Sequence, residues 1–139
     1  MSIDVKTIKL PEERLRKLDV ALVYLFGSQA EGVAGPLSDI DIGVVFADPK
    51  IARGDTLRIY NELYNLLTDH FDMSNFRNID IVFLERAPLE LQFDAISHGI
   101  TLFEISTDFR MNFEERTSAL YRDFKPLLNE FNQAVLARI

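Results

Sequence analysis

Apolar and polar residues follow one another along the chain in blocks whose lengths predict strands and helices. Two apolar runs of strand length cover residues 20–26 and 40–46; the first ends at Gly27 and the second at the turn Asp48-Pro49. The first run is apolar at every position, which predicts a central strand buried on both faces. Two shorter runs predict further strands over 79–84 and 100–105.

Helical patterns separate these strands. Pro11 and the two glutamates after it predict a short helix over about 11–18, because proline and acidic residues favour a helix N-terminus. Apolar residues spaced three and four apart predict an amphipathic helix over about 53–71, and Pro88 opens a short helix over 89–97. From Asp108 the chain is helical almost to its end, with a kink expected near 122–126 because Pro126 removes a backbone hydrogen bond. The mixture of strands and helices indicates an α/β fold.

The last helix has an unusually wide apolar face. One of its stripes consists of Phe113, Leu120, Phe124, Leu127, Phe131 and Ala134, and a neighbouring stripe consists of Tyr121, Leu128 and Val135. A single small domain does not cover both stripes, so part of this face is a candidate surface for binding a partner.

The length and net charge of the chain indicate how many domains it forms and which kinds of partner it can bind. The 139 residues are expected to form one domain over 1–139. Lys and Arg number 15 against 22 Asp and Glu, a net charge of −7 that argues against an extended nucleic-acid surface but permits one nucleotide if metal ions offset the charge. The chain has no cysteine, no signal-peptide pattern and no apolar run near the ~20 residues that span a membrane. A cytoplasmic protein without membrane contact is therefore expected.

Three aspartates stand in apolar surroundings. Asp39 and Asp41 flank one residue at the start of the second strand, so they share a face about 6–7 Å apart. Asp80 interrupts an otherwise apolar strand, where a lone buried carboxylate would be costly but one facing metal ions would not. Oxygen donors of this kind suit Mg²⁺ or Mn²⁺, which take further ligands from substrate phosphates.

The turn after the first strand has the features of a phosphate site. Gly27 has no side chain, so a phosphate can approach its backbone closely. Ser28 offers the phosphate a hydroxyl and an N–H at the start of an expected helical turn over 28–31. A glycine followed by serine is most often an ordinary turn, and two aspartates separated by one residue are by themselves a weak signal. Their combination, with about ten residues between Ser28 and Asp39, is far more specific.

This combination resembles the nucleotidyltransferase superfamily that includes DNA polymerase β. The runs 27–32, 38–42 and 121–126 resemble more narrowly the minimal nucleotidyltransferases, or MNT proteins, which are the antitoxin partners in HEPN–MNT toxin–antitoxin pairs. The resemblance implies a polymerase β-like α/β fold with a small mixed β-sheet flanked by helices and a long C-terminal helical segment.

The resemblance also implies residue roles. Gly27, Ser28 and Ser38 would bind the triphosphate of ATP, while Asp39, Asp41 and Asp80 would be catalytic and bind two Mg²⁺ (or Mn²⁺) ions. Asp80 would lie near the attacking hydroxyl as the general base. The reaction would transfer AMP from ATP to a hydroxyl, by family resemblance a tyrosine of the HEPN ribonuclease toxin, and so neutralise that toxin.

Two questions stay open at this point. Gln29 stands where many family members carry Arg or another residue, which leaves Lys50, Arg53 and Arg77 as possible substitutes beside the triphosphate, although each also fits a solvated surface charge. The alternative functions are an antitoxin that neutralises its partner by binding alone, with a vestigial nucleotide site, and modification of a small molecule such as an aminoglycoside. Modification of a small molecule fits less well, because the aminoglycoside nucleotidyltransferases of this superfamily usually add a substrate-binding domain.

Overall fold

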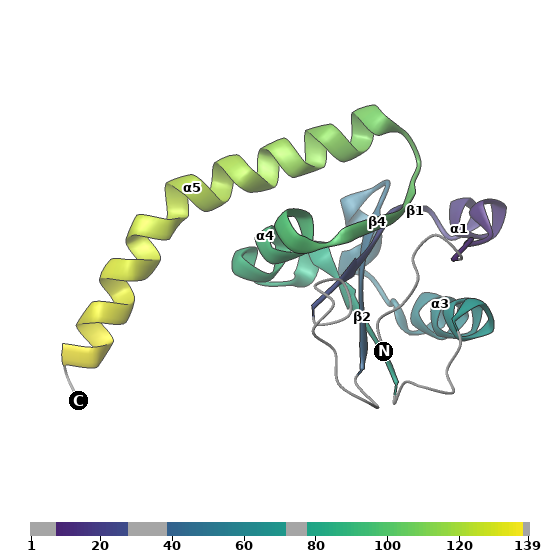
Figure 1. Ribbon diagram of the computed structural model, residues 1–139, viewed down its shortest axis with the longest axis horizontal. Helices are drawn as coiled ribbons and strands as arrows, with labels where there is room; N and C mark the ends of the chain where they lie inside the picture. The colour runs from purple at the N-terminus through teal and green to yellow at the C-terminus, as the bar shows by residue number, and fades with distance from the viewer. Residues whose placement is uncertain (1–7, 28–38, 72–77, 138–139) are drawn as a thin grey trace.

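Four strands form one mixed β-sheet in the order β3-β2-β1-β4. The computed structural model describes residues 8–27, 39–71 and 78–137 (Figure 1). The strands are β1 (Val20–Phe26), β2 (Ile40–Phe46), β3 (Ile79–Phe83) and β4 (Ile100–Glu104). β2 is parallel to β3, whereas β1 is antiparallel to both β2 and β4. The predicted strands are confirmed, and every residue of β1 is buried, as expected for a central strand.

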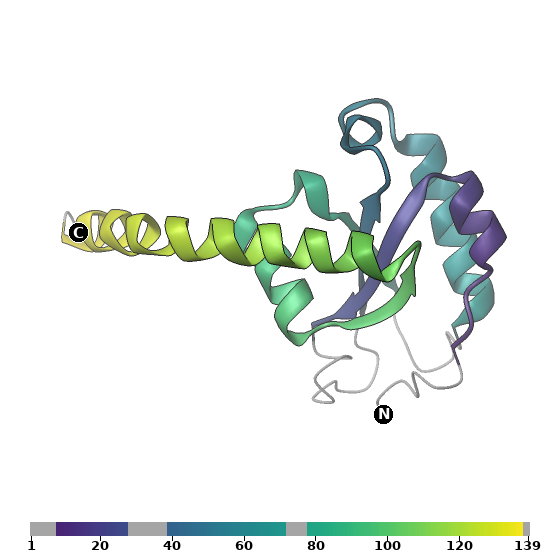
Figure 2. The same cartoon turned by 90° about the horizontal axis from the view of Figure 1, so that it is seen from above.

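Helices cover both faces of this sheet. α1 (Glu12–Lys17) and α3 (Leu57–His70) lie on one face, and α4 (Leu89–His98) and the first part of α5 (Thr107–Ala137) lie on the other (Figures 1 and 2). Burial divides accordingly into two apolar clusters. Ile40 and Ile42 belong to the cluster under α1 and α3, while Tyr24 and Phe26 belong to the cluster under α4 and α5.

The segment between β2 and α3 differs from the prediction. A helix starting near residue 53 is wrong: residues Pro49–Arg53 form the 3₁₀ helix η2, and α3 starts only at Leu57. Side chains cause this division, since Asp48 accepts a hydrogen bond from the N–H of Lys50 (3.0 Å) and Asp55 accepts one from the N–H of Leu57 (3.1 Å). A second 3₁₀ helix, η4 (Leu84–Arg86), follows β3. The helical turn expected over 28–31 lies outside the described residues.

α5 is a single helix of 31 residues that continues through Pro126. Its first part is packed: Phe113 and Thr117 are buried, and the ring of Tyr121 stacks on Phe93 of α4 with centroids 4.0 Å apart. The remainder runs clear of the sheet and bends along its length (Figures 1 and 2), which agrees with the expected effect of an internal proline. Within the described ranges, no helix is both long and apolar enough to cross a membrane.

Candidate active site

Register brings the predicted aspartates to one corner of the sheet. Asp41 of β2 lies opposite Asp80 of β3 in the parallel pair and opposite Phe26 of β1 in the antiparallel pair. Residues opposite each other on neighbouring strands point to the same face, with the strands about 4.8 Å apart. Because Ile40 and Ile42 are fully buried under α1 and α3, the aspartates face the side that α4 and α5 cover.

The electrostatics of this corner centre on Asp41, which is half-buried, whereas Asp39 and Asp80 are exposed. Burial raises the pKa of Asp41 to about 6, and the negative charges of Asp80 and then Asp39 add to the effect. Both neighbouring carboxylates therefore act on Asp41. Their mutual repulsion is of the kind that a bound divalent cation relieves.

The donor chemistry fits Mg²⁺ or Mn²⁺, but the side chains are not gathered around one point. Among the residues with described positions, no three His, Asp or Glu side chains are placed to hold a metal ion together. The carboxylates can affect the pKa of Asp41 without being gathered around one point. Coordination to Mg²⁺ requires oxygens at about 2.1 Å, whereas charges act over longer distances. The three carboxylates thus suit the ion in type and in charge.

Gly27 adjoins this corner at the end of β1. Its φ of 75° lies in the left-handed region, and a Cβ added there would overlap Oδ2 of Asp41. Only glycine meets both conditions without strain. A carboxylate therefore lies close to the backbone at Gly27, and the approach of a phosphate to this glycine stays a prediction. Ser28, Gln29 and Ser38 lie outside the described residues, so their proposed contacts with a triphosphate stay predictions.

A contact between α3 and β3 holds the start of both acidic strands and was not predicted. The backbone carbonyl of Asn78 accepts a hydrogen bond from the N–H of Ile40 (2.8 Å), and its side-chain Oδ1 accepts one from the hydroxyl of Tyr64 (2.5 Å). The backbone bond connects the residue two positions before Asp80 with the residue after Asp39. Nothing in the local sequence indicates that Asn78 is the hydrogen-bond partner of Tyr64.

The basic residues considered as contacts for the triphosphate are not found at the aspartate corner in the described part of the chain. Lys50 and Arg53 are exposed on η2, beyond the end of β2 that is far from Asp41. Phe46, at that end, is five positions along the strand from Asp41, roughly 17 Å away. Neither is placed to reach a triphosphate bound at Gly27. Arg77 lies outside the described residues.

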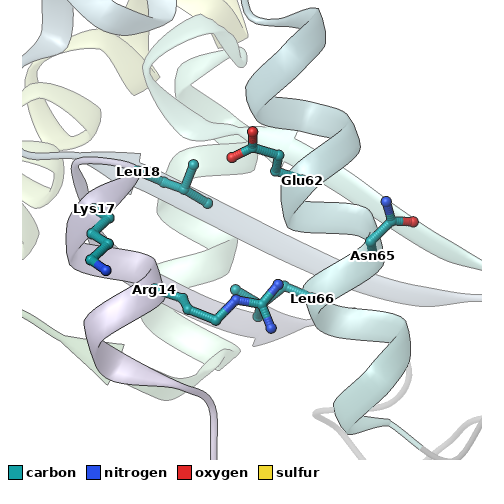
Figure 3. A pocket seen from close by; sticks show the side chains of 6 residues that line it. All are labelled: Arg14, Lys17, Leu18, Glu62, Asn65 and Leu66. Atoms are coloured by element: carbon teal, nitrogen blue, oxygen red, sulfur yellow. The ribbon is translucent and has the colours of Figure 1, made fainter.

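A cavity of about 280 Å³ lies between α1 and α3, away from the aspartates (Figure 3). Arg14 and Lys17 line one side, and Glu62 and Asn65 line the other. It contains none of the predicted site residues. The aspartate corner, rather than this cavity, is therefore the candidate active site.

The chain is similar in sequence to known proteins. The family model described as "Polymerase beta, Nucleotidyltransferase" matches residues 9–108. The protein adenylyltransferase MntA of Shewanella oneidensis is 33% identical over 119 residues, which cover 84% of this chain and 76% of that protein.

Solved structures show the same likeness. A chain in a crystal structure of a toxin–antitoxin with AMP-PNP is 26% identical with a TM-score of 0.67, over 91% of this chain and 99% of that chain. A structure of a tri-AMPylated Shewanella oneidensis HEPN toxin in complex with MNT antitoxin matches at 24% identity with a TM-score of 0.61, over 90% of this chain and 95% of that chain. At that lower identity the likeness shows the fold.

Proposed function

The chain belongs to the polymerase β nucleotidyltransferase family and, within it, to the minimal nucleotidyltransferases, and on that basis we propose that it transfers AMP from ATP to a cognate HEPN toxin. The acceptor is a hydroxyl, for which we propose a tyrosine, and the modification neutralises the ribonuclease activity of the toxin. We further propose that the chain acts as one domain in the cytoplasm. Support comes from the adenylyltransferase relative and from the similar chain in the toxin–antitoxin structure with AMP-PNP.

The observation that carries this proposal is the pairing of Asp41 with Asp80 beside Gly27. An aspartate pair on adjacent strands, with a third aspartate acting on the same carboxylate, is costly in an isolated fold. It becomes useful where cations and a triphosphate are bound. The three aspartates would hold two Mg²⁺ ions, which supply charge neutralisation for the triphosphate and lower the pKa of the attacking hydroxyl.

The residues of the chain have distinct roles in the transfer. The acceptor oxygen forms a bond to the α-phosphorus of ATP while the bond from that phosphorus to the oxygen of pyrophosphate breaks, and pyrophosphate leaves with the electron pair. Asp80, exposed on β3, accepts the proton of the hydroxyl. Asp39 and Asp41 would hold the cations that neutralise the phosphates, and Gly27 leaves space beside them because it has no side chain. Ser28 and Ser38 are proposed to donate hydrogen bonds to the triphosphate.

The test is a mass measurement on the toxin. The protein is incubated with the HEPN toxin encoded beside it, ATP and Mg²⁺, and the toxin is then weighed. The expected product carries one or more AMP units, which Asp41→Ala abolishes and Asp69→Asn, an exposed aspartate on α3, retains. The proposal is wrong if wild-type protein yields no adduct, or if the adduct persists in Asp41→Ala.

A second candidate function is neutralisation by binding alone, with a vestigial nucleotide site. The exposed apolar side chains in the described part of α5 favour it. The double variant Asp39→Asn, Asp41→Asn separates the two functions, because it retains neutralisation of the toxin's ribonuclease activity only if binding suffices.

A further inference from the structure

The strand that contains Asp80 is an edge strand of the sheet. In the order β3-β2-β1-β4, the one strand hydrogen-bonded to β3 among the described residues is β2. Side chains alternate along β3: Ile79, Ile81 and Phe83 are buried in the cluster under α1 and α3, whereas Asp80 is exposed on the other face. An edge strand offers a row of backbone N–H and C=O groups to a further strand. The proposed general base therefore lies where another polypeptide can join the sheet.

The register shows which backbone groups of β3 point away from β2. The N–H of Ile40 donates to the carbonyl of Asn78 (2.8 Å), and Ile40 lies opposite Ile79. In a parallel pair, a residue of one strand bonds to the two residues that flank its opposite number, so β2 binds alternate residues of β3. These alternate residues are Asn78, Asp80 and Val82. The N–H groups of Ile79, Ile81 and Phe83 therefore point to the open edge, where no described backbone group accepts a bond from them.

The groups of the candidate active site follow one another across the sheet and end at this edge. Gly27 follows β1, Asp41 lies in the neighbouring strand β2, and Asp80 lies beside Asp41 in β3. In phosphoryl-type transfer the leaving oxygen and the attacking oxygen lie on opposite sides of the phosphorus. The proposed function puts the triphosphate at Gly27 and the cations at Asp41, so the acceptor hydroxyl approaches from the side of Asp80. The next position beyond Asp80 is the open edge of β3.

A hollow of about 240 Å³ adjoins the same strand. Its lining residues are Ile81, Val82, Phe83, Arg86 and Ala87. An apolar cavity of about 150 Å³ is large enough to hold a benzene molecule, so this hollow has room for one large apolar side chain. It begins at Ile81, one residue after Asp80, and reaches Ala87 beyond η4. A segment that joins the sheet at Asp80 can therefore place a neighbouring side chain in the hollow.

We propose that an extended segment of the toxin adds to the open edge of β3 as a further strand and brings the acceptor hydroxyl to Asp80. Residues opposite each other on adjacent strands have Cβ atoms about 5 Å apart and project to the same face. Backbone hydrogen bonds to Ile79 and Ile81 hold such a segment whatever its sequence, while the hollow selects an apolar side chain near the acceptor. The inference rests on the proposed function and deepens it by naming the strand and the conformation in which the acceptor is presented.

Hydrogen exchange at single backbone amides tests the added strand. The measurement compares the Asp41→Ala protein alone with the same protein bound to the HEPN toxin encoded beside it, so that the toxin stays unmodified during exchange. Binding should slow exchange at Ile81 and Phe83 at least about tenfold, because each N–H gains a bonded partner. The amides of β4, at the opposite edge of the sheet, are the control and should change by less than about twofold. This experiment needs no substitution in β3.

Transfer kinetics test the hollow. Ala87→Arg puts a long charged side chain into it and should raise the KM for the toxin at least about tenfold, while the KM for ATP and kcat stay within about threefold of wild type. Ala47→Arg is the matched control, because Ala47 is exposed directly after β2 and lies outside the hollow; it should leave all three constants within about twofold. Urea unfolding of both variants checks that the fold is retained.

The outcomes separate this inference from the proposed transfer. Unchanged exchange at Ile81 and Phe83 on toxin binding, or equal slowing along β4, overturns the inference, and so does an unchanged KM for the toxin in folded Ala87→Arg. Slowing that develops without toxin as the protein concentration is raised assigns the edge to a second copy and also overturns it. AMP on the toxin without slowing at β3 overturns this inference alone, whereas slowing at β3 with no AMP transferred by wild type refutes the proposed transfer.

Discussion

Replacing Asp41 with asparagine is expected to make the isolated protein more stable at alkaline pH while it abolishes transfer. Burial and the charges of Asp80 and Asp39 raise the pKa of Asp41 from 3.8 to about 6 in the folded protein. The folded state therefore binds more protons than the unfolded state between these values, and stability falls as the pH rises through this window. The loss is complete above about pH 6 and absent below about pH 4.

The expected size of the effect follows from the shift. About two pKa units correspond to about 3 kcal/mol. Because Asp41 is only half-buried, solvent screening reduces the expected gain for Asp41→Asn to about 1–2 kcal/mol. Asparagine keeps the shape of the side chain and removes the charge, so the gain should follow the ionisation of Asp41 rather than a change in packing.

Urea unfolding without divalent metal measures this gain. At about pH 8, Asp41→Asn should have the higher free energy of unfolding, and near pH 3.5 it should equal wild type. Asp123→Asn, an exposed aspartate in the middle of α5, removes the same charge and is the matched control; it should change stability by less than about 0.5 kcal/mol at either pH. A variant no more stable than wild type at pH 8, or one whose gain does not depend on pH, refutes the reasoning.

Three further predictions concern the same corner. Gly27→Ala should lower the free energy of unfolding by about 1–3 kcal/mol, because the left-handed backbone and the overlap with Asp41 both oppose a side chain, and it should strongly reduce adenylyl transfer; full activity would contradict the role given to Gly27. Tyr64→Phe should cost about 0.5–1.5 kcal/mol through the lost bond to Asn78, and Tyr60→Phe, which loses no bond among the described residues, is its control in the same unfolding experiment. Chelation of divalent metal should abolish the AMP adduct and added Mg²⁺ or Mn²⁺ should restore it, whereas transfer that persists in chelator would exclude metal dependence.

The strands could be predicted almost to the residue, because their apolar runs end at strong turn signals. Gly27 ends β1, and Asp48-Pro49 follows β2. The start of α3 could not be predicted equally well. Apolar periodicity shows which face of a helix is buried, but the first turn depends on local hydrogen bonds such as the one from the N–H of Leu57 to Asp55.

The sequence predicts which aspartates share a face within a strand, but not which strands lie side by side. Alternation within each strand showed that Asp39 and Asp41 share a face. It also showed that the Asp80 side chain points to the other face of its strand than the side chains of Ile79 and Ile81. That Asp80 lies directly beside Asp41 depends on strand order and on the parallel register of β2 and β3. Both are set by packing between distant segments, which no local pattern specifies.

The two functional features are the places where the sequence opposes the stability of the isolated chain. Asp41 has a charge where burial disfavours it, and the outer part of α5 has leucine and phenylalanine side chains that nothing in the described fold covers. Natural sequences depart from locally favourable choices mainly at functional sites. A ligand that binds only the folded state stabilises it in proportion to the logarithm of its concentration over its Kd. Cations at the aspartates and a partner on the outer part of α5 should therefore each restore stability that the free protein lacks. They should do so independently, because no described contact joins Asp41 to the exposed part of α5.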